Sequence, residues 1–179
     1  MANAFELDRF ISDARAAARG PEPRAAMRRL MEEAVQDHAH VASVMPGFEG
    51  DDDGVVLFED ETISIWNARF RVGHEVPAHD HRMTATIGVY RGAECNQMWR
   101  SDGQGGIEKS GEVTVSEGEV YQIGPSAIHS VTCASETDCL GIHVYLGELT
   151  TVERSLFDVE TGQAMPFTDE NYARLTGAT

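Results

Sequence analysis

The chain has 179 residues, of which 41% are hydrophobic and 25% are charged, and this predicts one globular domain with a core of its own. Its formal net charge of −16 argues against a surface that binds nucleic acid or an anionic membrane. No apolar run approaches the length of a membrane span, so we expect no membrane partner. Three cysteines without C-x-x-C spacing indicate a reducing compartment, and we expect a cytoplasmic protein.

The N-terminal part is predicted to be helical. Apolar residues recur at helical spacing from Phe5 to Ala14, and Gly20-Pro21 ends this first helix. A second helix is predicted from there to Pro46-Gly47. His38 and His40 fall on it two residues apart, and such residues do not share a helix face. We therefore interpret these two histidines as surface or packing residues and not as metal ligands.

From residue 51 on, the pattern changes to short strands bounded by Gly, Pro, Ser and Asp. The predicted strands are 55–58, 62–71, 84–90, 94–100, 112–115, 120–123, 128–132 and 140–146. Many short strands with this punctuation indicate a β-barrel or sandwich. For the last segment, 151–179, we expect irregular backbone packed on the barrel, with a short helical turn near Glu170 to Leu175.

The segment Gly73 to Gly92 (GHEVPAHDHRMTATIGVYRG) carries the first candidate metal ligands. Alternate side chains of an extended strand share a face, so His79 and His81 point one way and Asp80 points the other, where we expect it to hydrogen-bond outside the barrel. Two imidazoles at that spacing can share a metal. His129, at the start of a later predicted strand, is the candidate third ligand. An isolated His-x-His pair is a weak signal, because such histidines are more often core or surface residues.

Two motifs together make the signal more specific. Gly73 followed by His79-x-His81, and later Gly118, Pro125 and His129, resemble the two sequence motifs of the cupin superfamily. The resemblance implies a mainly β fold, the double-stranded β-helix or jelly-roll barrel, with a metal in its mouth. We accordingly predict a single cupin domain over residues 1–179, with a helical N-terminal extension (1–47), a β-barrel core (54–150) and a C-terminal extension packed on the barrel (151–179).

The chain departs from the general cupin pattern at one ligand. That pattern places a carboxylate ligand shortly after the second histidine, where this chain has Ala85 and Thr86. Three neutral imidazoles leave a divalent metal with its full positive charge and with open positions, which suits an anionic ligand such as a thiolate. The common iron site of two histidines and one carboxylate differs in this respect.

A second group of candidate residues lies in Leu140 to Tyr145 (LGIHVY), where His143 and Tyr145 share one face of the predicted strand. This His-x-Tyr pair, together with the His-Asp-His motif, is similar to the thiol dioxygenases, which include cysteine dioxygenase and 3-mercaptopropionate dioxygenase. In that family a Ser-x-His-x-Tyr relay lines the pocket. The Ser position corresponds to Gly141 here, so we expect the outer hydrogen bond of the relay to be absent or supplied by water.

The resemblance implies a particular chemistry. Fe(II) would be bound by His79, His81 and His129, and a small thiol would be oxidised by O2 to the sulfinate. Tyr145 would donate a hydrogen bond near the reacting atoms, and His143 would fix the orientation of Tyr145. The expected partners are the thiol and O2, and the protein is expected to be a monomer or a homodimer.

Arg154 is the candidate substrate-binding residue. Animal-type cysteine dioxygenases bind the substrate carboxylate with an Arg on an early strand, but segment 54–59 holds no Arg. The mercaptopropionate type uses an Arg shortly after the relay tyrosine, where this chain has Arg154. A guanidinium can grip a carboxylate with two hydrogen bonds, so we favour 3-mercaptopropionate or a similar thiol over cysteine. A surface ion pair of Arg154 with Glu148, Glu153 or Asp158 is a competing interpretation.

Two functions stay open at this point. The first is an Fe(II)-dependent thiol dioxygenase, favoured by the missing carboxylate ligand and by the pair of His143 and Tyr145. The second is a metal-binding cupin of another class, either an isomerase or a non-catalytic small-molecule binder. Gly141, and the segment Met83 to Ala85 after the second histidine, keep this alternative open.

Overall fold

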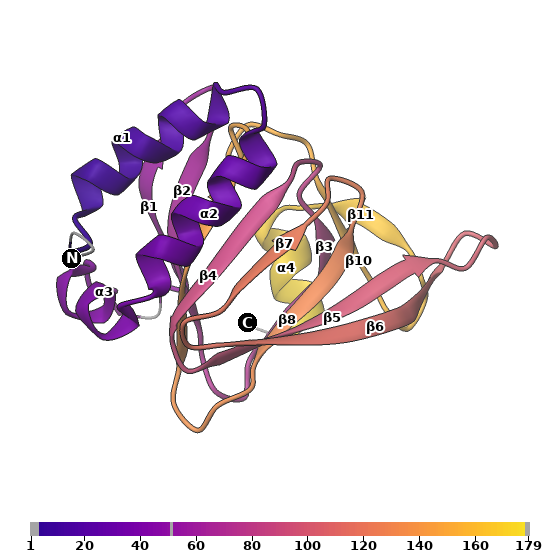
Figure 1. Cartoon of the computed structure of the whole chain (residues 1–179). Coiled ribbons are helices and arrows are strands. Elements are labelled where there is room, and N and C mark those ends of the chain that lie inside the picture. The colour runs from indigo at the N-terminus through magenta and orange to yellow at the C-terminus, as the bar shows by residue number, and fades with distance from the viewer. Residues whose placement is uncertain (1–3, 51, 178–179) are drawn as a thin grey trace.

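The structure is a computed structural model and describes residues 4–50 and 52–177 (Figure 1). It contains the helices α1 (Leu7–Ala18), α2 (Pro23–Val35), α3 (His38–Val44) and α4 (Asp169–Thr176). Its strands are β1 (Gly54–Glu59), β2 (Ser64–Phe70), β3 (Glu75–Asp80), β4 (Ala85–Arg91), β5 (Ala93–Ser101), β6 (Ile107–Ser116), β7 (Val120–Ile123), β8 (Ile128–Cys133), β9 (Cys139–Tyr145), β10 (Ser155–Phe157) and β11 (Ala164–Pro166).

The strands form two antiparallel sheets. One has the order β1-β2-β9-β4-β7 and the other the order β11-β10-β3-β8-β5-β6. Neighbours in both sheets come from distant parts of the chain, and the long β5–β6 hairpin projects at one edge (Figure 1). The mainly β double-stranded β-helix with a helical part at the N-terminus, predicted from the sequence, is therefore confirmed.

The strand β9 lies at the middle of the first sheet and has both faces buried. Its inward residues, His143 and Tyr145 among them, point between the sheets, whereas Ile142 and Val144 point outward into a core made with the helices. This explains why 140–146 (LGIHVYL) lacks the regular alternation of apolar and polar residues that a half-exposed strand shows. The predicted pair of His143 and Tyr145 thus comes from a central strand, held by β2 and β4 on its two sides.

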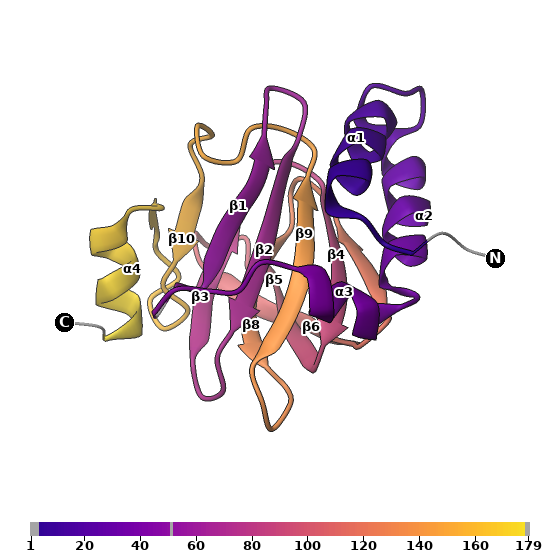
Figure 2. The same ribbon diagram turned by 90° about the vertical axis from the view of Figure 1, so that its left-hand side faces the viewer.

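The N-terminal helices cover the outer face of that sheet (Figures 1 and 2). Met27, Met31 and Val35 of α2 are fully buried against β4 and β7. Gly88 of β4 makes this close approach possible, because a Cβ there would lie 2.5 Å from Sδ of Met31. The helices and the sheet therefore share one hydrophobic core, and its buried residues come from both.

The second predicted helix is divided into two. The chain leaves α2 after Val35, and Asp37 begins α3 by accepting a hydrogen bond from the backbone N–H of His40 at 3.2 Å. An Asp side chain that caps a new helix in this way favours a break at that point. His38 and His40 do not come together in a site: Nε2 of His40 lies 3.0 Å from the carbonyl of Phe5, and His38 lies beside the exposed Glu117.

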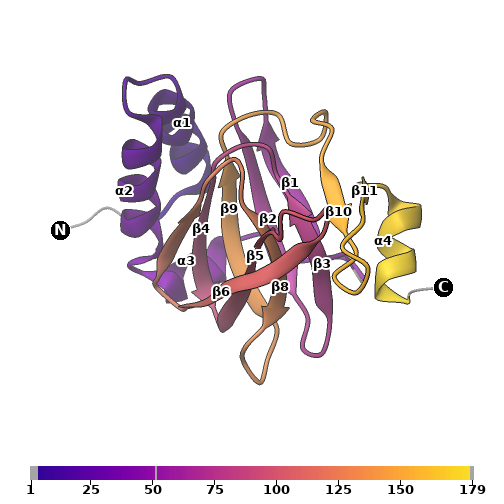
Figure 3. The ribbon, with the colours of Figure 1, turned by 90° about the vertical axis from the view of Figure 1, so that its right-hand side faces the viewer.

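The C-terminal segment is more regular than expected. It adds β10 beside β3 and β11 beside β10, and then the predicted short helix as α4. Leu156 of β10 is fully buried opposite His79, and this burial stabilises a strand of only three residues. The helix α4 lies at the opposite side of the barrel from α1 and α2 (Figures 2 and 3). No helix within the described ranges has the length and apolarity to cross a membrane.

Candidate metal centre

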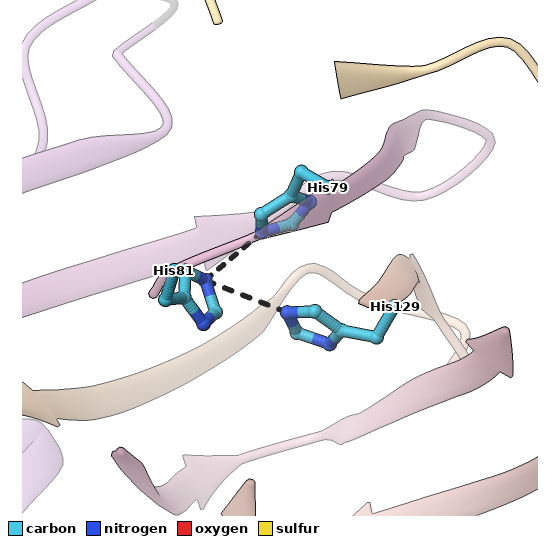
Figure 4. Close-up of side chains that lie close together, drawn as sticks. All are labelled: His79, His81 and His129. Carbon is cyan, nitrogen blue, oxygen red and sulfur yellow. Dashed lines mark hydrogen bonds between the residues drawn. The ribbon is translucent and has the colours of Figure 1, made fainter. Parts of the chain in front are cut away.

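Three histidines converge between the two sheets at the end of β3 (Figure 4). His79 lies in β3 and His81 follows directly after the strand, while His129 is the second residue of β8. The antiparallel pairing of β3 with β8 sets His79 opposite His129. All three are buried, and their candidate ligand atoms lie within 4.8 Å of one another. The structure thus brings together the three residues that the sequence suggested as ligands.

Two of the three nitrogen separations are close to those of neighbouring ligands on one metal ion. Nε2 of His81 lies 3.0 Å from Nε2 of His79 and 3.5 Å from Nε2 of His129, as the dashed lines in Figure 4 mark. Neighbouring nitrogens that bind one ion at about 2.1 Å would be separated by roughly 3.0 to 3.4 Å, for right-angled to tetrahedral geometry. Among the residues that the structure describes, the group contains no carboxylate, in agreement with Ala85 and Thr86 at the expected carboxylate position.

The outer nitrogens of two rings fix their tautomers. Nδ1 of His79 lies 2.8 Å from the carbonyl oxygen of Pro77, and Nδ1 of His129 lies 2.7 Å from Oδ1 of Asn96. Both oxygens can only accept a hydrogen bond, so each Nδ1 carries the proton and donates it. Each Nε2 then carries the lone pair, as a metal ligand requires.

Burial keeps the three imidazoles neutral. It lowers the pKa of His79 to about 4, with smaller lowering effects from Arg154 and His143 and an opposing effect from the Pro77 carbonyl. The pKa of His81 and that of His129 are also lowered well below the usual value, first by burial and then by neighbouring imidazoles. Three neutral nitrogen donors at neutral pH fit a divalent transition metal, so the chain holds a possible three-histidine metal site in a cupin fold.

The turn after β3 is held from outside. Asp80 accepts a hydrogen bond from the backbone N–H of Ser155 at 2.8 Å and forms an ion pair with Arg82 at 2.6 Å. Arg82 has a φ of 58°, an unusual value for a residue with a side chain, and its guanidinium also donates to the Ser155 hydroxyl at 3.1 Å. The prediction that Asp80 hydrogen-bonds outside the barrel is confirmed, and its contacts anchor His79 and His81 on either side.

Tyr145 and His143 lie next to the histidine cluster. The Tyr145 ring is 4.9 Å from the ring of His81, at an interplanar angle of 64°. Its hydroxyl lies 3.3 Å from Nδ1 of His143. Burial raises the pKa of Tyr145 well above its usual value, with a smaller raising effect of Glu94 and an opposing effect of Arg154. The phenol is therefore protonated over the whole physiological range and is available as a donor.

Glu94 completes this relay, and the sequence analysis missed it. Oε2 of Glu94 lies 3.1 Å from Nε2 of His143, and the carboxylate is fully buried. The expectation that the outer hydrogen bond is absent or supplied by water is therefore wrong. A Cβ built on Gly141 would lie 3.4 Å from the same Nε2, so a side chain at position 141 would be near this nitrogen. In this protein the carboxylate of Glu94, from β5, makes the hydrogen bond that the relay serine was expected to make. The sequence did contain a signal for Glu94. Glu94 and Asn96 are two polar residues at alternate positions of a strand, and both lie on the inward face of the barrel.

Arg154 lies beside the metal centre on the segment that leads into β10. Its guanidinium stacks on the ring of Phe167, with Cζ 3.8 Å from the ring centroid, and Phe167 in turn lies edge-on to His79 at 5.8 Å. Burial lowers the pKa of Arg154, and Tyr145 and Asp80 oppose this effect. Arg154 forms no ion pair with any carboxylate of the described residues, which removes the support for the competing surface-pair interpretation.

A cavity of about 680 Å³ opens beside Arg154. Its wall includes both Arg82 and Arg154, the side chain of Val152, and Phe167 from the C-terminal segment. None of the three histidines lines this cavity, and Phe167 is the lining residue whose ring lies beside His79. The volume is within the range of small-molecule sites.

No protein-family model matches the chain. Several solved structures resemble it in fold at 13% sequence identity. One is an uncharacterised protein with a double-stranded β-helix domain from Klebsiella pneumoniae, matched over 62% of this chain and 90% of that one with a TM-score of 0.48. Another is a cupin superfamily protein from Desulfitobacterium hafniense, matched over 60% and 88% with a TM-score of 0.47. A third is a cupin family protein with a double-stranded β-helix fold from Methanocaldococcus jannaschii, matched over 60% and 94% with a TM-score of 0.45. Likenesses this distant assign no activity to the chain, and the site must be interpreted from its own residues.

Proposed function

We propose that the protein is an Fe(II)-dependent thiol dioxygenase, which oxidises a small thiol carboxylate (3-mercaptopropionate or a cysteine-like compound) to the sulfinate with O2. One observation carries this proposal. Three neutral histidine ligands, without a carboxylate, lie beside a buried phenol whose ring contacts one of them. This combination agrees with the resemblance to thiol dioxygenases found in the sequence.

The charge of the ligand set favours an anionic thiolate. His79, His81 and His129 contribute no negative charge, so the site keeps the full charge of a divalent ion, and a thiolate gains more from it than a neutral ligand does. Bound Fe(II) would supply open coordination positions for the thiolate and for O2, whose two oxygen atoms are transferred to sulfur. The balanced reaction is R–SH + O2 → R–SO2H, with no other reductant or oxidant.

The relay residues would orient and stabilise the reacting groups. The Tyr145 hydroxyl lies 3.3 Å from Nδ1 of His143, and its ring packs beside His81. A buried polar group that is held in place stabilises developing charge without reorganising during the reaction. The role proposed for His143 is to hold this hydroxyl in one orientation.

Arg154 would bind the substrate carboxylate. Its stacking on Phe167 fixes the plane of the guanidinium, and its N–H groups have no carboxylate partner among the described residues. A fixed, partly buried guanidinium gives a two-pronged grip on a carboxylate. The contact of Phe167 with His79 keeps this grip close to the metal ligands, so a thiol with a short carboxylate arm suits both ends of the site.

One observation favours a second candidate, a metal-dependent isomerase. His143 is paired with a buried carboxylate, and a histidine with such a partner can act as a general base. An isomerase would use that base on a carbon acid and would consume no O2. The two candidates therefore differ in oxygen uptake.

The test begins with metal-free protein loaded anaerobically with Fe(II) and then mixed with O2 and a thiol. The panel is 3-mercaptopropionate, cysteine and cysteamine, with an oxygen electrode and mass spectrometry of the product as readouts. We expect one O2 consumed per thiol and both atoms of labelled O2 in the sulfinate. His129→Ala should abolish uptake, whereas His74→Ala, which changes an exposed histidine near the same strand, should leave it unchanged. Iron binding without O2 uptake on any of these thiols would overturn the proposal.

A further inference from the structure

A continuous hydrogen-bonded chain of side chains connects the phenol to a metal ligand. It begins at Tyr145, whose hydroxyl lies 3.3 Å from Nδ1 of His143, and passes from Nε2 of His143 to Oε2 of Glu94 at 3.1 Å. Oε1 of Glu94 accepts from Nδ2 of Asn96 at 2.9 Å, and Oδ1 of Asn96 lies 2.7 Å from Nδ1 of His129. All five side chains are buried, so the chain is shielded from solvent along its length.

Among these five hydrogen-bonded side chains, Glu94 is the only one that cannot donate a hydrogen bond when it is ionised. A carboxylate accepts only, so both of its neighbours must donate to it. Asn96 donates with its amide N–H, and this turns the amide oxygen toward His129. His129 must then carry its proton on Nδ1, which leaves the lone pair of Nε2 for a metal.

The same logic applies in the other direction. His143 must carry a proton on Nε2 in order to donate to Glu94, and its Nδ1 then faces the Tyr145 hydroxyl. Glu94 has no Lys or Arg partner among the described residues, and its side-chain partners are His143 and Asn96. Burying a carboxylate is costly unless its hydrogen bonds are complete. Because no ion pair with a described Lys or Arg explains the burial of Glu94, its hydrogen bonds to His143 and Asn96 are the evident reason for its position.

We propose that Glu94 is a positioning residue that sets the direction of every hydrogen bond in this chain, and thereby the tautomers of His129 and His143 together. The proposal deepens the function proposed above and rests on it in one respect only, the binding of a metal by His129 with its two partner histidines. The carboxylate that is missing from the ligand set is thus present one layer out. From there it acts through Asn96 on the metal ligand and through His143 on the phenol.

The substitution Glu94→Gln tests this with little change in shape. Gln has one acceptor and one donor where Glu has two acceptors, so it cannot accept from both neighbours. With a metal bound, His129 keeps its ligand tautomer, and the Gln oxygen continues to accept from Asn96. The Gln N–H2 then faces Nε2 of His143, which must lose its proton and accept.

The measurement is long-range 15N–1H NMR of the imidazole nitrogens, with zinc(II) as a redox-inert metal probe. In the wild-type protein we expect a proton on Nε2 of His143 and on Nδ1 of His129. In zinc-loaded Glu94→Gln, the Nε2 proton of His143 should be absent, and zinc affinity should fall about tenfold or more, as for other outer partners of metal ligands. Glu108→Gln removes the same charge from the exposed β5–β6 hairpin and should change neither readout.

Asn96→Ala separates the effect of these hydrogen bonds on His129 from their effect on His143. It removes the acceptor of His129 Nδ1 but leaves the contact between Glu94 and His143, so zinc affinity should fall while the Nε2 proton of His143 stays. The proposal is overturned if His143 lacks an Nε2 proton in the wild-type protein. It is also overturned if Glu94→Gln keeps that proton together with wild-type zinc affinity, or if Asn96→Ala binds zinc as the wild type does.

These readouts are independent of thiol oxidation. Failure of the iron-loaded protein to consume O2 would end the dioxygenase proposal and leave the tautomer assignments intact. Should Glu94→Gln not fold, the wild-type tautomers of His143 and His129 still decide the question. Failure of the wild-type protein to bind zinc would instead remove the metal-binding step on which this inference rests.

Discussion

The phenol ring of Tyr145 packs edge-on against the imidazole of His81, with ring centroids 4.9 Å apart. The hydroxyl is buried with a raised pKa, and it lies within hydrogen-bond distance of His143. A protonated phenol in this position cannot act as a base or a nucleophile near neutral pH, so it can serve the reaction only through the hydrogen bonds of its hydroxyl.

Tyr145→Phe should therefore slow turnover and leave the metal site in place. The ring that packs on His81 is retained, while the donor is lost, and loss of one such donor typically lowers kcat by roughly 10²-fold. Steady-state O2 uptake and iron content per protomer are the measurements. Tyr90→Phe is the matched control, because Tyr90 is also a buried phenol, bonded to Asn67 at 2.6 Å on the helix-facing side of β4. Loss of iron in Tyr145→Phe, with unchanged turnover per bound iron, would show a structural role for the hydroxyl.

Arg154→Gln should raise KM for thiols that carry a carboxylate and spare cysteamine, which has none. A hydrogen bond to a charged group contributes about 1.5–3 kcal/mol, so we expect KM for 3-mercaptopropionate to rise roughly 10- to 100-fold. Arg100→Gln is the control, because it removes a guanidinium from the exposed β5–β6 hairpin, where it pairs with Glu108. Equal losses for both kinds of thiol in Arg154→Gln would mean that Arg154 does not hold the carboxylate.

The sequence was informative where chemistry follows local spacing. His79 and His81 could be assigned to one site because an extended chain repeats every two residues, and His129 because it follows a Pro turn at the start of a strand. His143 and Tyr145 were found for the same reason. In each case the decisive geometry lies within a few residues of the motif.

The sequence was uninformative where the site depends on distant pairing. Glu94 meets His143 across 49 positions of sequence, and that contact exists only because β5 and β9 come together inside the barrel. The three-residue strands β10 and β11 are too short to show a periodicity, and β10 forms because Leu156 is buried opposite His79. The break before α3 did have a local signal, the Asp37 cap, and it was missed.

Gly88→Ala should loosen the N-terminal helices from the barrel. A Cβ there would lie 2.5 Å from Sδ of Met31 and 2.9 Å from Cγ1 of Val35, and a branched Val side chain on a helix has little freedom to move. Overpacking of this kind costs about 1–3 kcal/mol, which corresponds to a fall in Tm of roughly 2–12 °C for a chain of this length. Gly111→Ala, at a position with no neighbour within 4 Å of the added methyl group, should leave Tm unchanged. Zinc affinity should be the same in both variants, since Gly88 faces away from the histidines, and equal melting temperatures would contradict the tight contact.

The metal-free protein should lose stability as the pH falls from about 6.5 to about 4. The pKa of His79 is lowered to about 4 in the folded protein, chiefly by burial, whereas an imidazole in the unfolded chain titrates near 6.5. The unfolded state therefore binds more protons within this window, and the free energy of unfolding decreases as the pH falls through it. His79 alone accounts for about 3 kcal/mol at the lower end, and His81 and His129, whose pKa values are also lowered, act in the same direction.

Urea unfolding of the metal-free protein at a series of pH values across that window measures this effect. Carboxylates with a lowered pKa, such as Asp60 at about 2 (chiefly through the Thr62 hydroxyl), lose their contribution only as the pH falls to about 4–5 and below, so the upper part of the window reports on the histidines. His79→Asn should reduce the slope of the free energy of unfolding against pH, because one of the groups that titrates there is removed. A wild-type protein whose stability is constant from neutral pH down to about pH 4.5 would contradict the burial of neutral imidazoles at this site.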